Sequence, residues 1–175
     1  MAAGDAGVSV GGAQRDAVVT RSDNQIVVTA GEVTATIGTE LKDGTPGELD
    51  ANGNVRLSAG DRIKISLNGF KPGSRVDVWM FSTPVLLGTT KVGSDGRVSG
   101  SFVVPENAET GAHRVTVVAR TNDDKPATLT VGFEVGEWDT GPGVTVWLIV
   151  LPIALAIGGA LTLPATRRRR RRLAA

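Results

Sequence analysis

The sequence contains no cysteine, no tyrosine and a single histidine among its 175 residues. The absence of cysteine excludes disulfide bonds, thiolate nucleophiles and cysteine-based zinc sites, although it does not identify the compartment. One histidine, His113, cannot form a histidine-rich metal site. No GxSxG, Walker-type or GxGxxG motif occurs either. The sequence therefore indicates no catalytic, metal-binding or cofactor-binding residues, and we expect neither enzymatic activity nor a cofactor.

Excess positive charge is missing from most of the chain. Residues 1–166 contain 13 Lys and Arg against 18 Asp and Glu, which gives 13 − 18 = −5, and the six arginines at 167–172 add +6. The larger part is therefore mildly acidic, without the basic footprint that nucleic-acid binding requires. We expect no nucleic-acid partner.

Charge of either sign is missing from one long stretch. Residues 144–163 read VTVWLIVLPIALAIGGALTL, twenty residues without a charged side chain. A helix rising about 1.5 Å per residue would span roughly 30 Å over this length, the hydrocarbon thickness of a bilayer. We therefore predict one transmembrane helix with the lipid bilayer as its partner. Ala154 and Gly158 are spaced for weak helix self-association, although packing without a specific partner is the simpler interpretation.

Six consecutive arginines follow the predicted span and indicate its topology: Arg167, Arg168, Arg169, Arg170, Arg171 and Arg172. Positive charge beside a span is retained in the cytoplasm. We therefore expect a single-pass protein of the cell membrane, with residues 1 to about 140 outside the cell and residues 164–175 as a cytoplasmic tail. This topology requires export, yet the first residues, MAAGDAGVSVGG, lack the basic and apolar regions of a signal peptide. We expect the chain to be the C-terminal portion of a longer exported protein, or a sequence begun too late.

The remainder of the chain has the pattern of β structure. Val, Thr and Gly are abundant, and candidate strands with alternating apolar residues are separated by turn-forming clusters about every 8–12 residues. We predict a flexible lead-in (1–15), a small β-rich segment (16–53), an immunoglobulin-like sandwich of about seven strands (54–136) and a linker (137–143). The predicted fold class is all-β, an immunoglobulin-like β-sandwich followed by a single C-terminal transmembrane α-helix.

One turn has residues that bind cations in other proteins. Asp50, Asn52 and Asn54 are spaced like the start of a calcium loop, but the acidic ligand that completes an EF-hand is missing downstream. Strand patterns, not helices, flank these residues. A hairpin turn is therefore the favoured interpretation.

Two aromatic residues occupy the strand positions that are expected to face solvent. Trp79 and Phe81 alternate with Val78 and Met80, so they point away from the predicted core. Two interpretations are open for these aromatics and for the residues that follow, Pro84, Leu86 and Leu87. Local packing under the 84–87 segment is the favoured one, and the other is an exposed patch that contacts an extracellular protein or a glycan.

The region around these residues resembles a known module. Residues 69–121, GFKPGSRVDVWMFSTPVLLGTTKVGSDGRVSGSFVVPENAETGAHRVTVVART, with ATLTVGFEVG downstream, resemble the C-terminal Ig-like module of actinobacterial cell-surface proteins. Those proteins carry the pattern GF.PGS.V.VW.FSTP..LGT…DG..SG.F..P, followed by a membrane span and an arginine-rich tail. The resemblance covers about residues 54–172. It implies surface display and supplies no catalytic residues.

Three functions fit this sequence. The leading hypothesis is a non-enzymatic, membrane-anchored module that displays or spaces a surface protein. The second is an adhesin or binding module that uses the 79–87 region or the loops at the ends of the sandwich. The third is the C-terminal anchor of a longer exported enzyme.

Overall fold

The structure is a computed structural model that describes residues 1–22 and 24–136. The predicted linker, transmembrane helix and arginine tail, together with Ala154 and Gly158, lie outside the described residues. Within the described part, no helix has the length and apolar character needed to cross a membrane.

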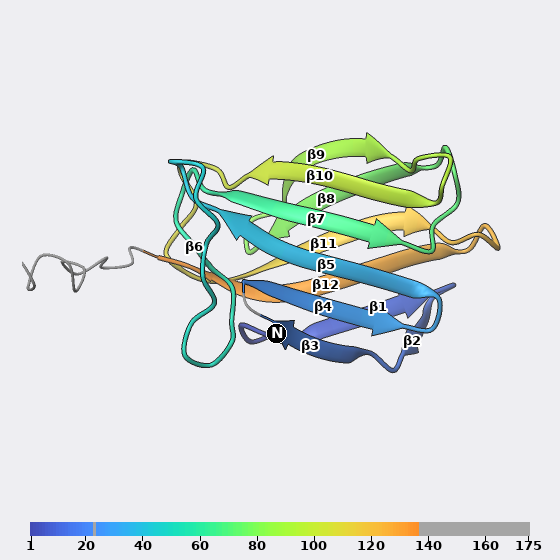
Figure 1. Cartoon of the computed structure of the whole chain (residues 1–175), viewed down its shortest axis with the longest axis horizontal. Coiled ribbons are helices and arrows are strands. Elements are labelled where there is room, and N and C mark those ends of the chain that lie inside the picture. The colour runs from blue at the N-terminus through green and yellow to red at the C-terminus, as the bar shows by residue number, and fades with distance from the viewer. Residues whose placement is uncertain (23, 137–175) are drawn as a thin grey trace, which may run out of the picture. The chain divides into compact units, whose positions relative to one another are not determined.

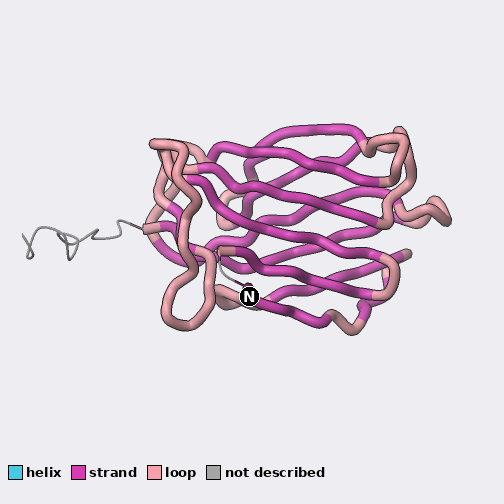
Figure 2. The backbone as a smooth tube through the Cα atoms, viewed as in Figure 1, coloured by secondary structure: helices cyan, strands magenta, loops and turns pink. Residues whose placement is uncertain are grey.

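Strands of the described residues form two sheets packed face to face (Figures 1 and 2). One sheet has the order β2-β1-β12-β11-β8-β9, with β6 also paired to β12, and the other has the order β10-β7-β5-β4-β3. All pairings are antiparallel except β6 with β12. The strands of the first sheet are β1 (Ala6–Val10), β2 (Ala13–Arg15), β6 (Arg56–Leu57), β8 (Arg75–Phe81), β9 (Val85–Lys91), β11 (Gly111–Arg120) and β12 (Pro126–Val135). Those of the second are β3 (Val18–Ser22), β4 (Gln25–Ala30), β5 (Val33–Glu40), β7 (Arg62–Asn68) and β10 (Arg97–Val103).

The core lies between the two sheets and follows the alternation of the sequence. In β7, Ile63, Ile65 and Leu67 are buried while the residues between them are exposed, and in β8 Val78 and Met80 are buried. Alternate side chains of a strand point to opposite faces, so one face of each sheet is apolar and closes on the other sheet. The predicted all-β, two-sheet sandwich is confirmed for the described residues.

The first fifteen residues differ from the prediction of a flexible lead-in. Residues Ala6–Val10 form β1, which pairs with β12 over five positions, and Ala13–Arg15 form β2. Val8 is only 1% exposed and belongs to the core. The local sequence is rich in glycine and alanine, so the strand is stabilised by its pairing with a distant partner and not by its own pattern.

The predicted boundary at residues 53/54 does not separate two bodies. Strand β5, from the first predicted segment, pairs with β7, from the second, over seven positions between Thr34–Asn68 and Glu40–Arg62. The described residues accordingly belong to one compact unit. Both segments contribute strands to a common core.

Residues 49–55 form the expected hairpin turn. Leu49 and Val55 form an antiparallel bridge. The carboxylate of Asp50 accepts hydrogen bonds from the backbone N–H groups of Asn52 and Asn54, each at 2.8 Å. These bonds close the turn and lower the pKa of Asp50 below its ordinary value, mainly through the N–H of Asn54.

Candidate functional site

The outer surface of the first sheet carries a group of aromatic and aliphatic side chains together with one arginine. We call the group of Trp79, Phe81, Leu86, Arg114 and Val118 the aromatic face. These residues come from the neighbouring strands β8, β9 and β11 and point away from the core. Leu86 is 42% exposed and Val118 is 39% exposed, while the two aromatic side chains are half-buried.

A β-bulge brings Leu86 into this group. Val78 pairs with Gly88 and Trp79 pairs with Leu86, so Leu87 is an extra residue between two ladder positions. An extra residue in one strand moves the side chains beyond it to the opposite face of the sheet. Leu86 therefore lies beside Trp79 on the outer surface, while Leu87 packs against the core.

The structure divides the five residues of the predicted contact patch. Trp79 and Phe81 are half-buried side by side, with ring centroids 6.4 Å apart and a tilt of 31°. Pro84 and Leu86 are exposed, and Leu86 lies opposite Trp79 in the β8–β9 ladder, so packing of the rings against residues 84–87 stays a prediction. Leu87 is half-buried and packs against the core. A contact role for the patch stays a prediction.

Arg114 is a member of this surface that the sequence pattern did not single out. It lies opposite Phe81 in the β8–β11 ladder, and its guanidinium carbon is 5.4 Å from the centre of the Phe81 ring. This is the distance of a cation–π contact. Among residues 1–22 and 24–136 no carboxylate forms an ion pair with Arg114.

The acidic residue beside the aromatic face, Asp77, is hydrogen-bonded by two neighbouring side chains. Asp77 accepts hydrogen bonds from Thr89 Oγ1 at 2.6 Å and from Arg75 Nε at 2.7 Å. The hydroxyl of Thr89, and secondly the guanidinium of Arg75, hold the pKa of Asp77 below its ordinary value. Asp77 is therefore a paired surface carboxylate.

A polar hollow lies beside the aromatic face. Its volume is about 300 Å³, and its lining consists of Met1, Gly7, Ser9, Gln14, Arg114, Thr128 and Thr130. Arg114 belongs to both the hollow and the aromatic face. Thr116 connects them, because it pairs with Trp79 on one side and with Thr130 on the other, and its hydroxyl is 3.1 Å from that of Thr130.

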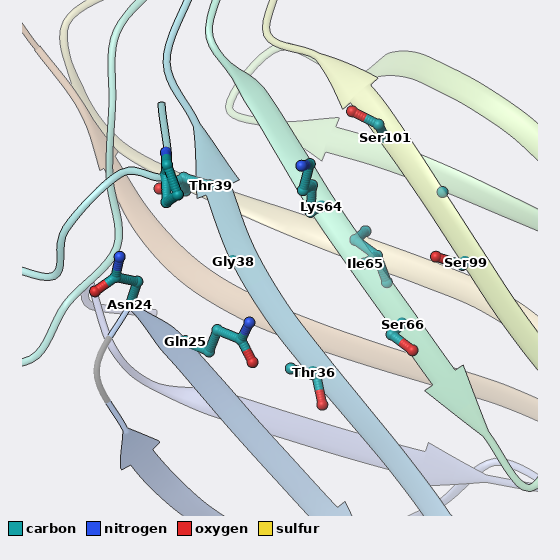
Figure 3. A pocket seen from close by; sticks show the side chains of 12 residues that line it. Asn24, Gln25, Thr36, Gly38, Thr39, Lys64, Ile65, Ser66, Ser99 and Ser101 are labelled. Carbon is teal, nitrogen blue, oxygen red and sulfur yellow. The ribbon is translucent and has the colours of Figure 1, made fainter. Parts of the chain in front are cut away.

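The outer surface of the second sheet is polar and has a larger hollow of about 480 Å³ (Figure 3). We call its group of outward side chains, Gln25, Thr36, Ser66, Ser99 and Ser101, the serine–threonine face. Thr36, Ser66 and Ser99 lie in one row across β5, β7 and β10. Lys64 of the same surface is ion-paired with Glu40. No aromatic residue lines this hollow.

His113 is a buried residue with both ring nitrogens bonded. Its Nε2 is 2.7 Å from the carbonyl oxygen of Glu109, which can only accept, so Nε2 carries the hydrogen. Nδ1 then accepts from the hydroxyl of Ser82 at 3.0 Å. The ring also packs against Phe133, with centroids 5.9 Å apart. These contacts tie the end of β8 to the loop before β11.

The described residues contain no group of three or more His, Cys, Asp or Glu side chains that could hold a metal ion. Asp50, Asn52 and Asn54 bond to one another within their turn. The six arginines of the predicted topology signal lie beyond residue 136, outside the described part.

Comparison with known proteins assigns no family to the chain. No family model matches the chain, and no curated protein matches it. Among solved structures, the crystal structure of the PmoD soluble domain from Methylocystis sp. ATCC 49242 (Rockwell) is similar at 15% sequence identity and a TM-score of 0.42. The likeness covers 63% of this chain and 96% of that one. At this TM-score it carries no functional argument.

Proposed function

We propose that the chain is a non-enzymatic, membrane-anchored module that displays or spaces a surface protein outside the cell. The observation that carries this proposal is that few residues separate the last strand of the sandwich from a long uncharged stretch. The last strand of the sandwich ends at Val135, and residues 144–163 form an uncharged stretch long enough to cross a bilayer. Six arginines follow that stretch. A folded domain joined closely to a single span is held near the membrane surface.

The strand order of residues 54–136 supports the immunoglobulin-like part of the proposal. Strands β12-β11-β8-β9 are neighbours in one sheet, and β10-β7 are neighbours in the other. Immunoglobulin-type sandwiches place their G-F-C-C′ strands and their E-B strands in the same way. Strands β5, β4 and β3 extend the second sheet beside β7. The module would then be an immunoglobulin-like sandwich enlarged at one edge.

Such a domain suits a spacer because it has one continuous core. Buried residues from both sheets and from both halves of the described chain belong to a single cluster. A close-packed interior of this kind resists deformation. The sandwich would therefore hold whatever it carries at a fixed distance from the bilayer.

Protease treatment of intact cells tests the topology. The full chain is expressed behind an added export signal, with one epitope tag before residue 1 and a second after residue 175. We expect protease to remove the first tag and residues up to the linker, while the second tag survives until the cells are lysed, because the arginines retain the tail inside. Survival of the first tag and of residues 17–136 in intact cells, with loss of both once the cells are lysed, would overturn the proposal.

A binding role is the second candidate, and one observation favours it. The aromatic face combines two half-buried aromatic rings with an exposed Leu86 on the surface of a rigid sheet. Side chains of this kind are concentrated in recognition surfaces. An adhesin would present this face to a partner outside the cell.

A further inference from the structure

We propose that the aromatic face, together with the polar hollow beside it, binds a carbohydrate chain. This inference rests on the outer surface of the first sheet alone. It does not depend on the proposed membrane anchor, so either proposal can fail without the other.

The aromatic rings supply a stacking platform. Trp79 and Phe81 project from alternate positions of β8, half-buried, with their ring centres 6.4 Å apart. A sugar ring has apolar faces of C–H groups and a polar rim of hydroxyls. The flat faces of indole and phenyl rings bury such C–H surfaces well, and their electron-rich centres attract the C–H hydrogens. Trp79 would stack on one sugar, and the next sugar of the chain would contact Phe81 together with the Arg114 guanidinium that already lies over its ring.

The adjoining hollow supplies hydrogen-bonding groups. From Trp79 the sheet continues through Thr116 to Thr130, so the hollow begins about 10 Å from the indole at the usual spacing between strands. Thr128, Thr130, Ser9 and Gln14 provide hydroxyl and amide groups there. These groups can both donate to and accept from sugar hydroxyls.

Arg114 joins the two parts of the surface. Its guanidinium packs on Phe81 and also lines the hollow. The side chain has no acidic partner among the described residues, so its N–H groups can donate to the oxygen atoms of a sugar placed between the rings and the hollow. A guanidinium in cation–π contact with a ring has already lost part of its freedom, which reduces the entropy lost on binding.

The polar lining favours a carbohydrate over a protein partner. An apolar protein surface that covered both the rings and the hollow would remove water from Ser9, Gln14 and Thr128. A carbohydrate replaces that water with its own hydroxyls while its C–H faces cover the rings. The mixture of aromatic platform and hydroxyl-lined hollow therefore fits a sugar chain better than an apolar protein surface.

The serine–threonine face is the less suitable surface, although its hollow is larger. Its lining contains hydroxyl, amide and ammonium groups and no aromatic ring. Exchanging hydrogen bonds with water for hydrogen bonds with a sugar yields only a small net gain. Pro46 and Ile65 add apolar surface to that hollow, but no flat ring lies there on which a sugar could stack. It serves instead as an internal control.

Affinity electrophoresis tests the proposal with the full chain. The protein, kept in micelles of lauryldimethylamine oxide so that no sugar-based detergent competes, is run in native gels containing laminarin, dextran or galactomannan. These polymers are uncharged, so the arginine tail cannot cause retardation. We expect at least one of them to retard the chain in proportion to its concentration. No retardation by any of the three would overturn the proposal.

Variants locate the site. Trp79→Ala should weaken retardation at least tenfold, Trp79→Phe should retain most of it because a ring remains, and Arg114→Gln should weaken it severalfold. Ser99→Ala, on the opposite sheet, is the matched control and should behave as the unaltered chain. Circular dichroism establishes that each variant is folded. Equal retardation of Trp79→Ala and the unaltered chain, or a loss caused by Ser99→Ala, would overturn the assignment to the aromatic face.

Discussion

Gly69, at the end of β7, shows how one residue permits two loops to meet. Its φ is +90°, and a side-chain Cβ at this position would lie against the backbone carbonyl of Glu32, in the turn between β4 and β5. A left-handed conformation disfavours any residue with a Cβ, and a backbone atom cannot move aside as a side chain can. Glycine is therefore required here for both space and conformation.

Gly69→Ala should lower the free energy of unfolding by about 3 kcal/mol, of which the positive φ accounts for about 1–2 kcal/mol and the contact with the backbone for the rest. Gly73→Ala is the matched control, because its φ is +74° and nothing lies within 4 Å of the added methyl group. It should cost only about 1–2 kcal/mol. Urea denaturation of both variants measures the difference, and equal losses would contradict the role of the Glu32 carbonyl.

At the scale of the element, the 49–55 hairpin has a turn that depends on an ionised side chain. Asp50 accepts two backbone N–H groups that no strand partner satisfies, and these bonds favour its charged form. Because the pKa of Asp50 is lowered on folding, its contribution to stability is present above its ordinary pKa of 3.8. That contribution is lost as the pH falls through the lower pKa of the folded state.

Asp50→Asn should therefore lower the free energy of unfolding by about 1 kcal/mol at pH 7, since a charge-assisted acceptor is replaced by a neutral one. The difference between the variant and the unaltered chain should shrink as the pH is lowered below 3.8. Denaturant unfolding at a series of pH values gives both curves. A difference that stays constant down to the most acidic pH would show that the charge of Asp50 is not what stabilises the turn.

The strands could be predicted where the pattern was local. In β7 and β12 the alternation of apolar and polar residues marks both the strand and its buried face, and the structure has both. Strand β1 could not be predicted, because Val8 stands between glycine and serine and its partner, Leu129, is far away in sequence. Strand pairing of this kind depends on long-range contacts, which no short window of sequence contains.

The candidate site was predicted only in part, for a related reason. Trp79 and Phe81 stood out because they broke the parity of their strand, and the structure places both on the outer surface. The bulge that brings Leu86 beside Trp79 has no clear signal in the sequence. Arg114 and Thr130 read as ordinary outward residues, and only the register of β8, β11 and β12 brings them next to the aromatic rings.

At the scale of the whole molecule, the described residues share one core although the sequence suggested two pieces. Ile26 of β4 comes from the first predicted segment and Ile63 of β7 from the second, and both are almost completely buried in the same cluster. The β5–β7 pairing holds the two segments together along seven residue pairs. A domain built in this way should unfold in a single cooperative step.

Two matched substitutions test whether the described residues unfold as one cooperative unit. Ile26→Val and Ile63→Val each remove one buried methyl group, which should cost about 0.5–1.5 kcal/mol. In the full chain, held in detergent micelles, each variant should shift one and the same thermal transition of the β signal in circular dichroism downward by a few degrees. The double variant should shift it by about the sum of the two, unless the altered sites interact. If residues 16–53 formed a separate body, two transitions would appear and Ile26→Val would move only one of them. A single transition that both variants lower is expected, because neither half of the described chain can bury its apolar face without the other.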